Sequence, residues 1–195
     1  SFDTDFKVDN YQSQQIVNAV KDAGIVGMGG AGFPTHVKLA ADPNKRKEIM
    51  IINACESEPF ITCDYRLMRD WTYQLIAGIK LAAKAANCFK VRIGIEDNKP
   101  KAIKALKNAL QKSKTSSGIE VVPVKTKYPQ GGERQLIRAL TGRNVPTGGI
   151  PPMIGAVVLN VATCAAIAEA AVYNTPLTHR IITVTGSGVE KTGNF

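Results

Sequence analysis

Two loops of this chain carry the residue types best suited to bind a flat, charged ligand. The first is GMGGAGFPT at residues 27–35, where glycine fills four of the six positions from 27 to 32. Glycine has no Cβ and adopts positive φ, so its N–H group can approach an anion closely. The second is NACESEP at residues 53–59, where Glu56 and Glu58 flank a serine and face either a site or solvent. The sequence therefore predicts a ligand at the glycine loop.

Two more turns carry polar groups that suit a ligand. YPQGGE at residues 128–133 precedes a predicted helix, so its glycines and the first helical N–H groups form a second anion site. Asn160 ends an apolar segment, a position that suits a hydrogen bond to a ligand. Thr163 follows at a position from which it could cap the next helix.

The elements that must position these loops follow from hydrophobic periodicity. Strands are expected at residues 48–53, 90–95, 119–124, 156–161 and 180–185, and helices at residues 12–23, 64–86, 100–111, 133–140 and 163–172. In the long helix at 64–86, Trp71 is expected on the buried face. Alternating helices and strands, with strands apolar on both faces, predict an α/β fold with a mostly parallel sheet covered by helices on both sides. Ligands bind such sheets at the carboxyl ends of the strands, where these loops lie.

Length and composition limit the function classes. With 195 residues, 44% of them hydrophobic, the chain is expected to form a single domain, and no run approaches the roughly 20 apolar residues of a membrane span. The first residues lack the pattern of a signal peptide, which suggests a cytoplasmic protein. The chain also lacks an initiator methionine, so we expect a piece of a longer protein.

The net charge of +9 favours anionic ligands, acidic partner proteins or nucleic acid. Many of the lysines lie along the predicted helix at 100–111, with few aromatic residues between them to stack on bases. A solvated helix face explains this pattern, but a basic module that binds nucleic acid or an acidic protein remains an alternative.

The four cysteines, Cys55, Cys63, Cys88 and Cys164, lack the CxxC spacing of zinc and iron–sulfur sites, so free thiols are expected. Cys55 lies in the acidic loop, where it is either a small buried residue or part of the site.

The glycine loop admits two other interpretations. A flexible linker is usually polar, whereas hydrophobic residues bracket this loop. Gly27, Gly29 and Gly32 also match GxGxxG, with Glu56 at about the distance of the ribose-binding acid. That fingerprint must follow a strand and open a helix, whereas this loop follows a predicted helix. The Rossmann interpretation therefore fails on context.

Four motifs together resemble a known family. The chain has GMGGAGFPTHVK at residues 27–38, NACESEP at 53–59, YPQGGE at 128–133 and LNVAT at 159–163. In the same order they resemble the GRGGAGFPTGLK-like, NADExEP-like, YxCGEE-like and TxxNNVET-like motifs of the NADH- and FMN-binding subunit of respiratory complex I. The RnfC subunit of the Rnf electron-transport complex is related to that subunit.

The Rnf branch resembles this chain more than the respiratory branch does. The similar segments are ESEPFIT at 56–62, DYRLM at 64–68, IGIEDNKP at 93–100 and LTGR at 140–143. Met28, Cys55 and Gly132 replace the Arg, Asp and first Glu of the respiratory motifs.

The resemblance implies a Rossmann-like FMN-binding domain of the complex I flavoprotein type, with noncovalent FMN and with NADH as substrate. The implied FMN-binding residues are Gly27, Gly29, Gly30, Gly32, Lys38, Asn53, Cys55, Gly131 and Asn160. The implied NADH-binding residues are Phe33, Glu56, Glu58 and Glu133. Hydride transfer to flavin needs stacking and orientation, so no catalytic acid or base and no metal ligand is expected here.

The resemblance also implies partners and a place in the cell. Family members carry a small β-grasp-like domain and an iron–sulfur segment, neither of which occurs in these 195 residues. The expected partners are ferredoxin and the Rnf-type membrane subunits of an ion-translocating complex, without nucleic acid and without a membrane span in this chain. We expect a peripheral position on the cytoplasmic face of the membrane. An RnfC-like reductase with another acceptor, such as cobalamin, is the alternative within enzymes.

Overall fold

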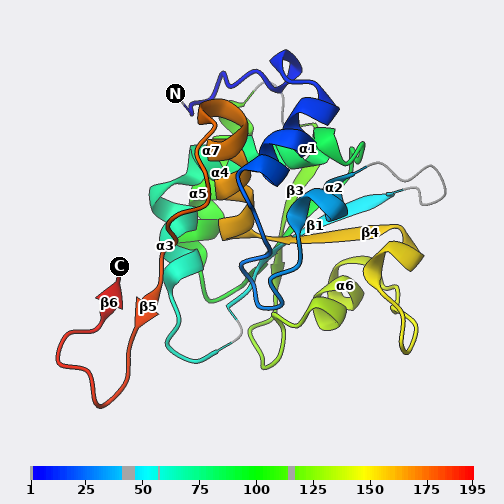
Figure 1. The fold of residues 1–195 in the computed structure, drawn as a ribbon. Helices are drawn as coiled ribbons and strands as arrows, with labels where there is room; N and C mark the ends of the chain where they lie inside the picture. The colour runs from blue at the N-terminus through cyan, green and yellow to red at the C-terminus, as the bar shows by residue number, and fades with distance from the viewer. Residues whose placement is uncertain (1, 41–46, 57, 114–116) are drawn as a thin grey trace.

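A four-stranded parallel sheet forms the centre of the molecule (Figure 1), in a computed structural model that describes residues 2–40, 47–56, 58–113 and 117–195. Its order is β3 (Ile119–Val124), β2 (Val91–Glu96), β1 (Ile49–Ala54) and β4 (Ala156–Asn160). In the register of the two central pairings, Ile52 lies beside both Ile93 and Leu159. The expected α/β fold with a parallel sheet is confirmed.

Helices cover both faces of the sheet. The described helices are α1 (Ser13–Asp22), α2 (Thr35–Leu39), α3 (Cys63–Asp70), α4 (Thr72–Ala85), α5 (Pro100–Lys112), α6 (Glu133–Thr141) and α7 (Val161–Tyr173), with short 3-10 helices η1 (Val8–Asn10) and η2 (Pro151–Ile154).

The two faces of the sheet form two cores, and successive residues of β1 alternate between them. Met50 and Ile52 join the larger core with residues of α1, α4, α5 and α7, whereas Ile49 and Ile51 join the smaller core under α6. Side chains of a strand point alternately to opposite faces, so a strand with both faces buried must be apolar throughout. The continuous apolar run of β1 follows from its central position.

The predicted helix at 64–86 is two helices, and the prediction for Trp71 is wrong. The chain leaves helical geometry at Trp71, with φ −122° and ψ 38°, and the indole is 40% exposed. Leu67 of α3 and Leu75 of α4 are buried as expected. Trp71 lies between the two helices in non-helical geometry. The helical periodicity that predicts burial of Leu67 and Leu75 therefore does not apply to Trp71.

The strand predicted at 180–185 does not join the parallel sheet. Only β5 (Thr183–Val184) forms there, and it pairs antiparallel with β6 (Gly193–Asn194) in a separate two-stranded sheet. The backbone N–H of Leu177 donates to the carbonyl of Ala23, which holds the segment after α7 beside α1. After α7 the chain therefore runs beside α1 and does not add a strand to the sheet at its β4 edge.

Candidate functional site

Backbone and side-chain hydrogen bonds fix the glycine loop beside the start of α7. The N–H of Gly27 donates to the carbonyl of Phe33 at 2.9 Å and closes the loop at its base. The N–H of Met28 donates to Oγ1 of Thr163 at 3.0 Å, and Nη2 of Arg180 donates to the Met28 carbonyl at 3.2 Å. Gly32, with φ +62°, adopts the left-handed conformation that glycine permits. The loop follows α1 and not a strand of the sheet, which removes the context that a Rossmann fingerprint requires.

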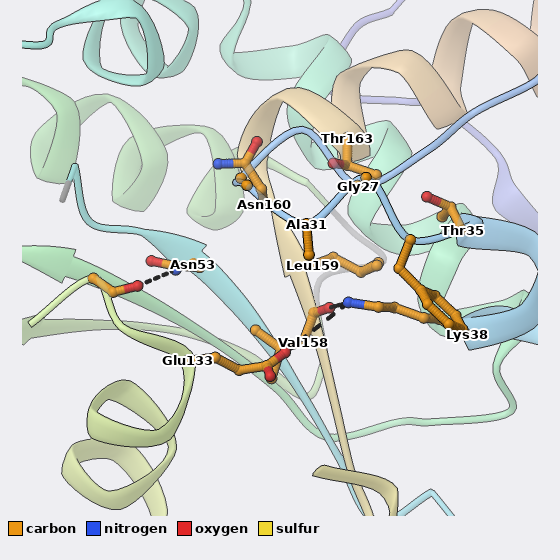
Figure 2. Close-up of a pocket in the computed structure, with 15 residues that line it drawn as sticks. Gly27, Ala31, Thr35, Lys38, Asn53, Glu133, Val158, Leu159, Asn160 and Thr163 are labelled. Atoms are coloured by element: carbon orange, nitrogen blue, oxygen red, sulfur yellow. Dashed lines mark hydrogen bonds and ion pairs between the residues drawn. The ribbon is translucent and has the colours of Figure 1, made fainter. Parts of the chain in front are cut away.

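A pocket of about 180 Å³ opens between this loop, α2 and the carboxyl ends of β1 and β4 (Figure 2). Ten of the thirteen predicted site residues line it: Gly27, Gly29, Gly30, Gly32, Phe33, Lys38, Asn53, Gly131, Glu133 and Asn160. Ala31, Thr35, Val158, Leu159 and Thr163 also line it and were not predicted to contact a ligand. The four motifs thus converge on one cavity at the carboxyl edge of the sheet, as the fold class requires.

Lys38 is the cation of this pocket. Its Nζ donates to the carbonyl of Val158 at 3.1 Å and lies 4.0 Å from Oε1 of Glu133. It also lies 5.9 Å from the centre of the Phe33 ring, which is 46% exposed. The pocket therefore combines a positive charge and an aromatic face with backbone N–H groups.

Two asparagines connect the motifs. Nδ2 of Asn53 donates to the carbonyl of Gly131 at 2.8 Å and joins the end of β1 to the YPQGGE turn. Oδ1 of Asn160 accepts from the N–H of Ala162 at 2.8 Å, so Asn160 and not Thr163 caps α7. The prediction that Thr163 caps this helix is wrong, because Asn160 stands at the N-cap and the Thr163 hydroxyl accepts from the glycine loop.

Three predicted site residues lie outside this pocket, and Glu56 has a structural role. The Glu56 side chain is only 3% exposed. Its Oε1 accepts from the N–H groups of Asp64 and Tyr65 in the first turn of α3, at 3.1 and 3.2 Å, and its Oε2 lies 2.9 Å from Nζ of Lys99. A carboxylate at a helix N-terminus is stabilising. The prediction that Glu56 faces a site or solvent is therefore wrong.

Glu58 and Cys55 point elsewhere. Glu58 is exposed and lines a second cleft of about 240 Å³, together with Phe60 and Tyr128. Cys55 is buried in the smaller core, where its thiol lies 3.4 Å from the carbonyl of Gly94. Burial first, and then the charges of Glu96 and Glu56, raise the pKa of this thiol to about 12. Cys55 is a protonated packing residue, so its side chain does not line the predicted cofactor pocket.

Two features of the pocket are consistent with a bound ligand. Thr35 is fully buried at the wall of the pocket, and its hydroxyl has no hydrogen-bond partner among the residues that the structure describes. A Cβ on Gly29 would lie 3.2 Å from Cβ of Asn160, so only glycine leaves this part of the pocket open. A buried hydroxyl without a partner is costly, and an acceptor on a ligand would remove that cost.

The described residues contain no helix that is long and apolar enough to cross a membrane. Within the same part of the chain, no three His, Cys, Asp or Glu side chains are grouped closely enough to hold a metal ion.

Comparisons with curated proteins find relatives that match nearly all of this chain. The C subunit of the proton-translocating ferredoxin:NAD(+) oxidoreductase complex of Clostridium ljungdahlii is 46% identical over 182 residues, which are 93% of this chain and 39% of that protein. The C subunit of the Na(+)-translocating complex of Acetobacterium woodii is 45% identical and covers 94% of this chain and 41% of that protein. The C subunit of the ion-translocating oxidoreductase complex of Vibrio cholerae is 47% identical over 181 residues, which are 93% of this chain and 23% of that protein. The chain thus spans about two fifths or less of the length of these relatives, which confirm the resemblance to RnfC.

Solved structures with the same fold include an NAD+-reducing NiFe hydrogenase in its air-oxidized state. It aligns with a TM-score of 0.69 and 30% identity over 82% of this chain and 30% of that chain. The H2-reduced state aligns with a TM-score of 0.64. The family model described as the Nuo51 FMN-binding domain matches residues 20–169, which include the glycine loop, the acidic loop, the YPQGGE turn and Asn160. The chain therefore belongs to the Nuo51 FMN-binding domain family.

Proposed function

We propose that this domain binds FMN in the pocket at the ends of β1 and β4 and exchanges electrons between NADH and an iron–sulfur acceptor. The observation that carries the proposal is the convergence of four separate motifs on one pocket with a cation, an unpartnered hydroxyl and glycine backbone. Family membership and the names of the relatives support the same cofactor and substrate.

The residues of the pocket divide into two groups by their chemistry. The N–H groups of the glycine loop and Nζ of Lys38 suit the phosphate of FMN, because both attract and orient an anion. Phe33 and Glu133 line the open side, where an aromatic face and an acceptor suit a nicotinamide nucleotide. FMN, when bound, supplies the hydride and single-electron chemistry, and the protein supplies binding and orientation.

Glu58 remains part of the proposal as a residue of the second cleft. Its exposed carboxylate lies after β1, in the loop that also carries Glu56. We propose that a nucleotide that extends from the first pocket to this cleft contacts Glu58. Glu56 would then affect nucleotide binding indirectly, by holding α3 and Lys99 in place, and would not contact the nucleotide itself.

The activity of the whole protein is proposed from its relatives. Since each of them is the C subunit of an ion-translocating complex, we propose the same place for the protein to which this domain belongs. In that arrangement the described domain forms one FMN- and NADH-binding unit of residues 1–195. Iron–sulfur clusters lie in other parts of the protein, ferredoxin and membrane subunits are its partners, and it is peripheral on the cytoplasmic face.

Flavin fluorescence provides the direct test. Adding the purified domain to FMN is expected to quench the fluorescence at micromolar protein, and NADH is expected to bleach the absorbance of the bound flavin. Riboflavin, which lacks the phosphate, should bind more weakly because the contact with Lys38 is lost. Quenching that is equally strong for riboflavin and FMN would contradict the assignment of the phosphate to Lys38. A full-length chain that leaves free FMN unquenched would contradict the proposed function.

A Thr35→Val substitution separates a ligand-binding role of the hydroxyl from a structural role. Valine has nearly the same shape and removes a buried hydroxyl that has no partner among the described residues. We expect the free energy of unfolding of the FMN-free domain to stay the same or rise by about 1 kcal/mol, because the cost of the unpaired group disappears. FMN affinity should fall, because its acceptor loses a donor.

Urea unfolding without FMN and a fluorescence titration with FMN measure these two effects, and Thr35→Ser, which keeps the hydroxyl, is the matched control. A Thr35→Val domain that is less stable than the wild type without FMN, and that binds FMN equally well, would show that the hydroxyl is structural.

A further inference from the structure

Asp64 is a half-buried carboxylate next to Asn160, a residue of the proposed flavin pocket. It lies in the first turn of α3, and its Oδ2 accepts from Nδ2 of Asn160 at 2.7 Å. Asn160 lines the pocket, caps α7 with its other amide atom and stands against Gly29. Asp64 and the N–H of Ala162 together fix which way the amide of a pocket residue points.

The charged and titratable groups around Asp64 come from three directions. Glu56, in the loop after β1, accepts from the backbone N–H of Asp64, and Cys63 precedes Asp64 in α3. The guanidinium of Arg180 comes from the segment after α7, where it also binds the Met28 carbonyl. Burial raises the pKa of Asp64 to about 6, with a further increase from Glu56, and the hydrogen bond from Asn160 and the charge of Arg180 oppose that increase.

This arrangement costs stability at neutral pH. A carboxyl group with a raised pKa in the folded protein stabilises the fold when it is protonated, below its unfolded pKa of 3.8. The stabilisation is lost as the pH rises through about 6. At neutral pH the domain thus has an ionised, half-buried carboxylate where a neutral side chain would be more stable. Such a pKa shift is common at functional sites.

We propose that Asp64 is a positioning residue that fixes the Asn160 amide for FMN, and that its ionisation makes FMN binding depend on pH. The proposal rests on FMN as the ligand of the pocket. An ionised Asp64 accepts only, so Nδ2 of Asn160 must point to it and Oδ1 must cap α7. When Asp64 is protonated, the hydrogen bond loses its charge and about half of its strength, and the amide of Asn160 is less firmly oriented.

The test compares the wild-type domain with Asp64→Asn in FMN titrations between about pH 8 and about pH 5. An asparagine can still accept from Nδ2 of Asn160 but carries no charge at any pH. Wild-type affinity is expected to fall roughly fivefold toward the acid end, as the charge-assisted bond is lost. Asp64→Asn should lose the part of this pH dependence that Asp64 causes and keep only the part that comes from the phosphate of FMN.

The phosphate of FMN titrates near pH 6 as well, so its contribution must be separated. Riboflavin has no phosphate, and its affinity for the wild type should keep the pH dependence that Asp64 causes. Asp70→Asn, which removes an exposed carboxylate paired with Arg66 in the same helix, is the control for charge and should retain the wild-type profile.

Thermal unfolding without FMN gives an independent readout. Asp64→Asn is expected to melt above the wild type at neutral pH, with the difference vanishing near the unfolded pKa of Asp64. A variant that weakens FMN equally at all pH values, with the wild-type pH dependence retained, would overturn the proposal. Failure of the wild type to bind FMN would overturn the proposed function, whereas a wild type that binds FMN and riboflavin without the Asp64-dependent profile would overturn this inference alone.

Discussion

Gly78→Ala is expected to destabilise the domain by more than about 3 kcal/mol, a large part of the roughly 5–15 kcal/mol that stabilises a typical domain. A Cβ on Gly78 of α4 would lie 1.8 Å from the carbonyl oxygen of Cys164 in α7. That atom belongs to the helix backbone, so no side-chain rotation can make room for the methyl group. The two helices would have to separate along a buried interface that includes Leu75 and Ile167.

The effect of Gly78→Ala should extend to the pocket, because Asn160 caps α7 and Thr163 lies on the first turn of that helix. Urea unfolding measures the loss of stability, and Gly188→Ala is the matched control because nothing lies within 4 Å of a Cβ there. If Gly78→Ala unfolds within about 1 kcal/mol of the wild type, the direct contact between the backbones of α4 and α7 is contradicted.

The sequence was sufficient to predict the parallel sheet because its strands are mostly apolar and alternate with helices. The segment around Ile52 is apolar up to Asn53, and the segment around Ile93 is apolar apart from Arg92 and Glu96. Both strands are central in the sheet. The separate strand β5 was misjudged for a related reason: a short apolar run around Ile182 is typical of a buried strand, yet Ile182 is 47% exposed. Hydrophobicity alone does not show whether a segment returns to the sheet.

Pocket residues were predictable where a motif concentrates glycine, as at Gly29, or places a polar residue at the end of an apolar strand, as at Asn53. Thr35 was missed, since a threonine at the start of a helix has an ordinary local explanation and only its burial without a partner marks it. Glu56 was assigned to the ligand because its partners, at Tyr65 and Lys99, are distant in sequence. Whether a carboxylate contacts a ligand or a helix N-terminus depends on tertiary contacts that a single sequence does not display.

Gly29→Val is expected to weaken FMN binding roughly 10- to 100-fold while the domain stays folded. A Cβ at Gly29 would already lie 3.2 Å from Cβ of Asn160, and the two further methyl groups of valine add volume at a residue that lines the pocket. The φ angle at Gly29 is not in the left-handed region, so the backbone itself accepts a side chain. The loss should therefore appear in the affinity for FMN rather than in the free energy of unfolding.

Fluorescence titration measures the affinity, and Gly188→Val provides the same substitution where nothing lies within 4 Å of the added Cβ. The control should bind FMN as the wild type does. Gly29→Val acts by volume and Asp64→Asn acts by charge, so the pH dependence of their FMN affinities must differ. The valine variant is expected to bind FMN weakly at every pH. Its affinity should still fall toward acid pH, because its Asp64 is intact. A valine variant that binds FMN as tightly as the wild type would place the flavin away from Gly29 and Asn160, and the pocket between the glycine loop and β4 would then not be its site.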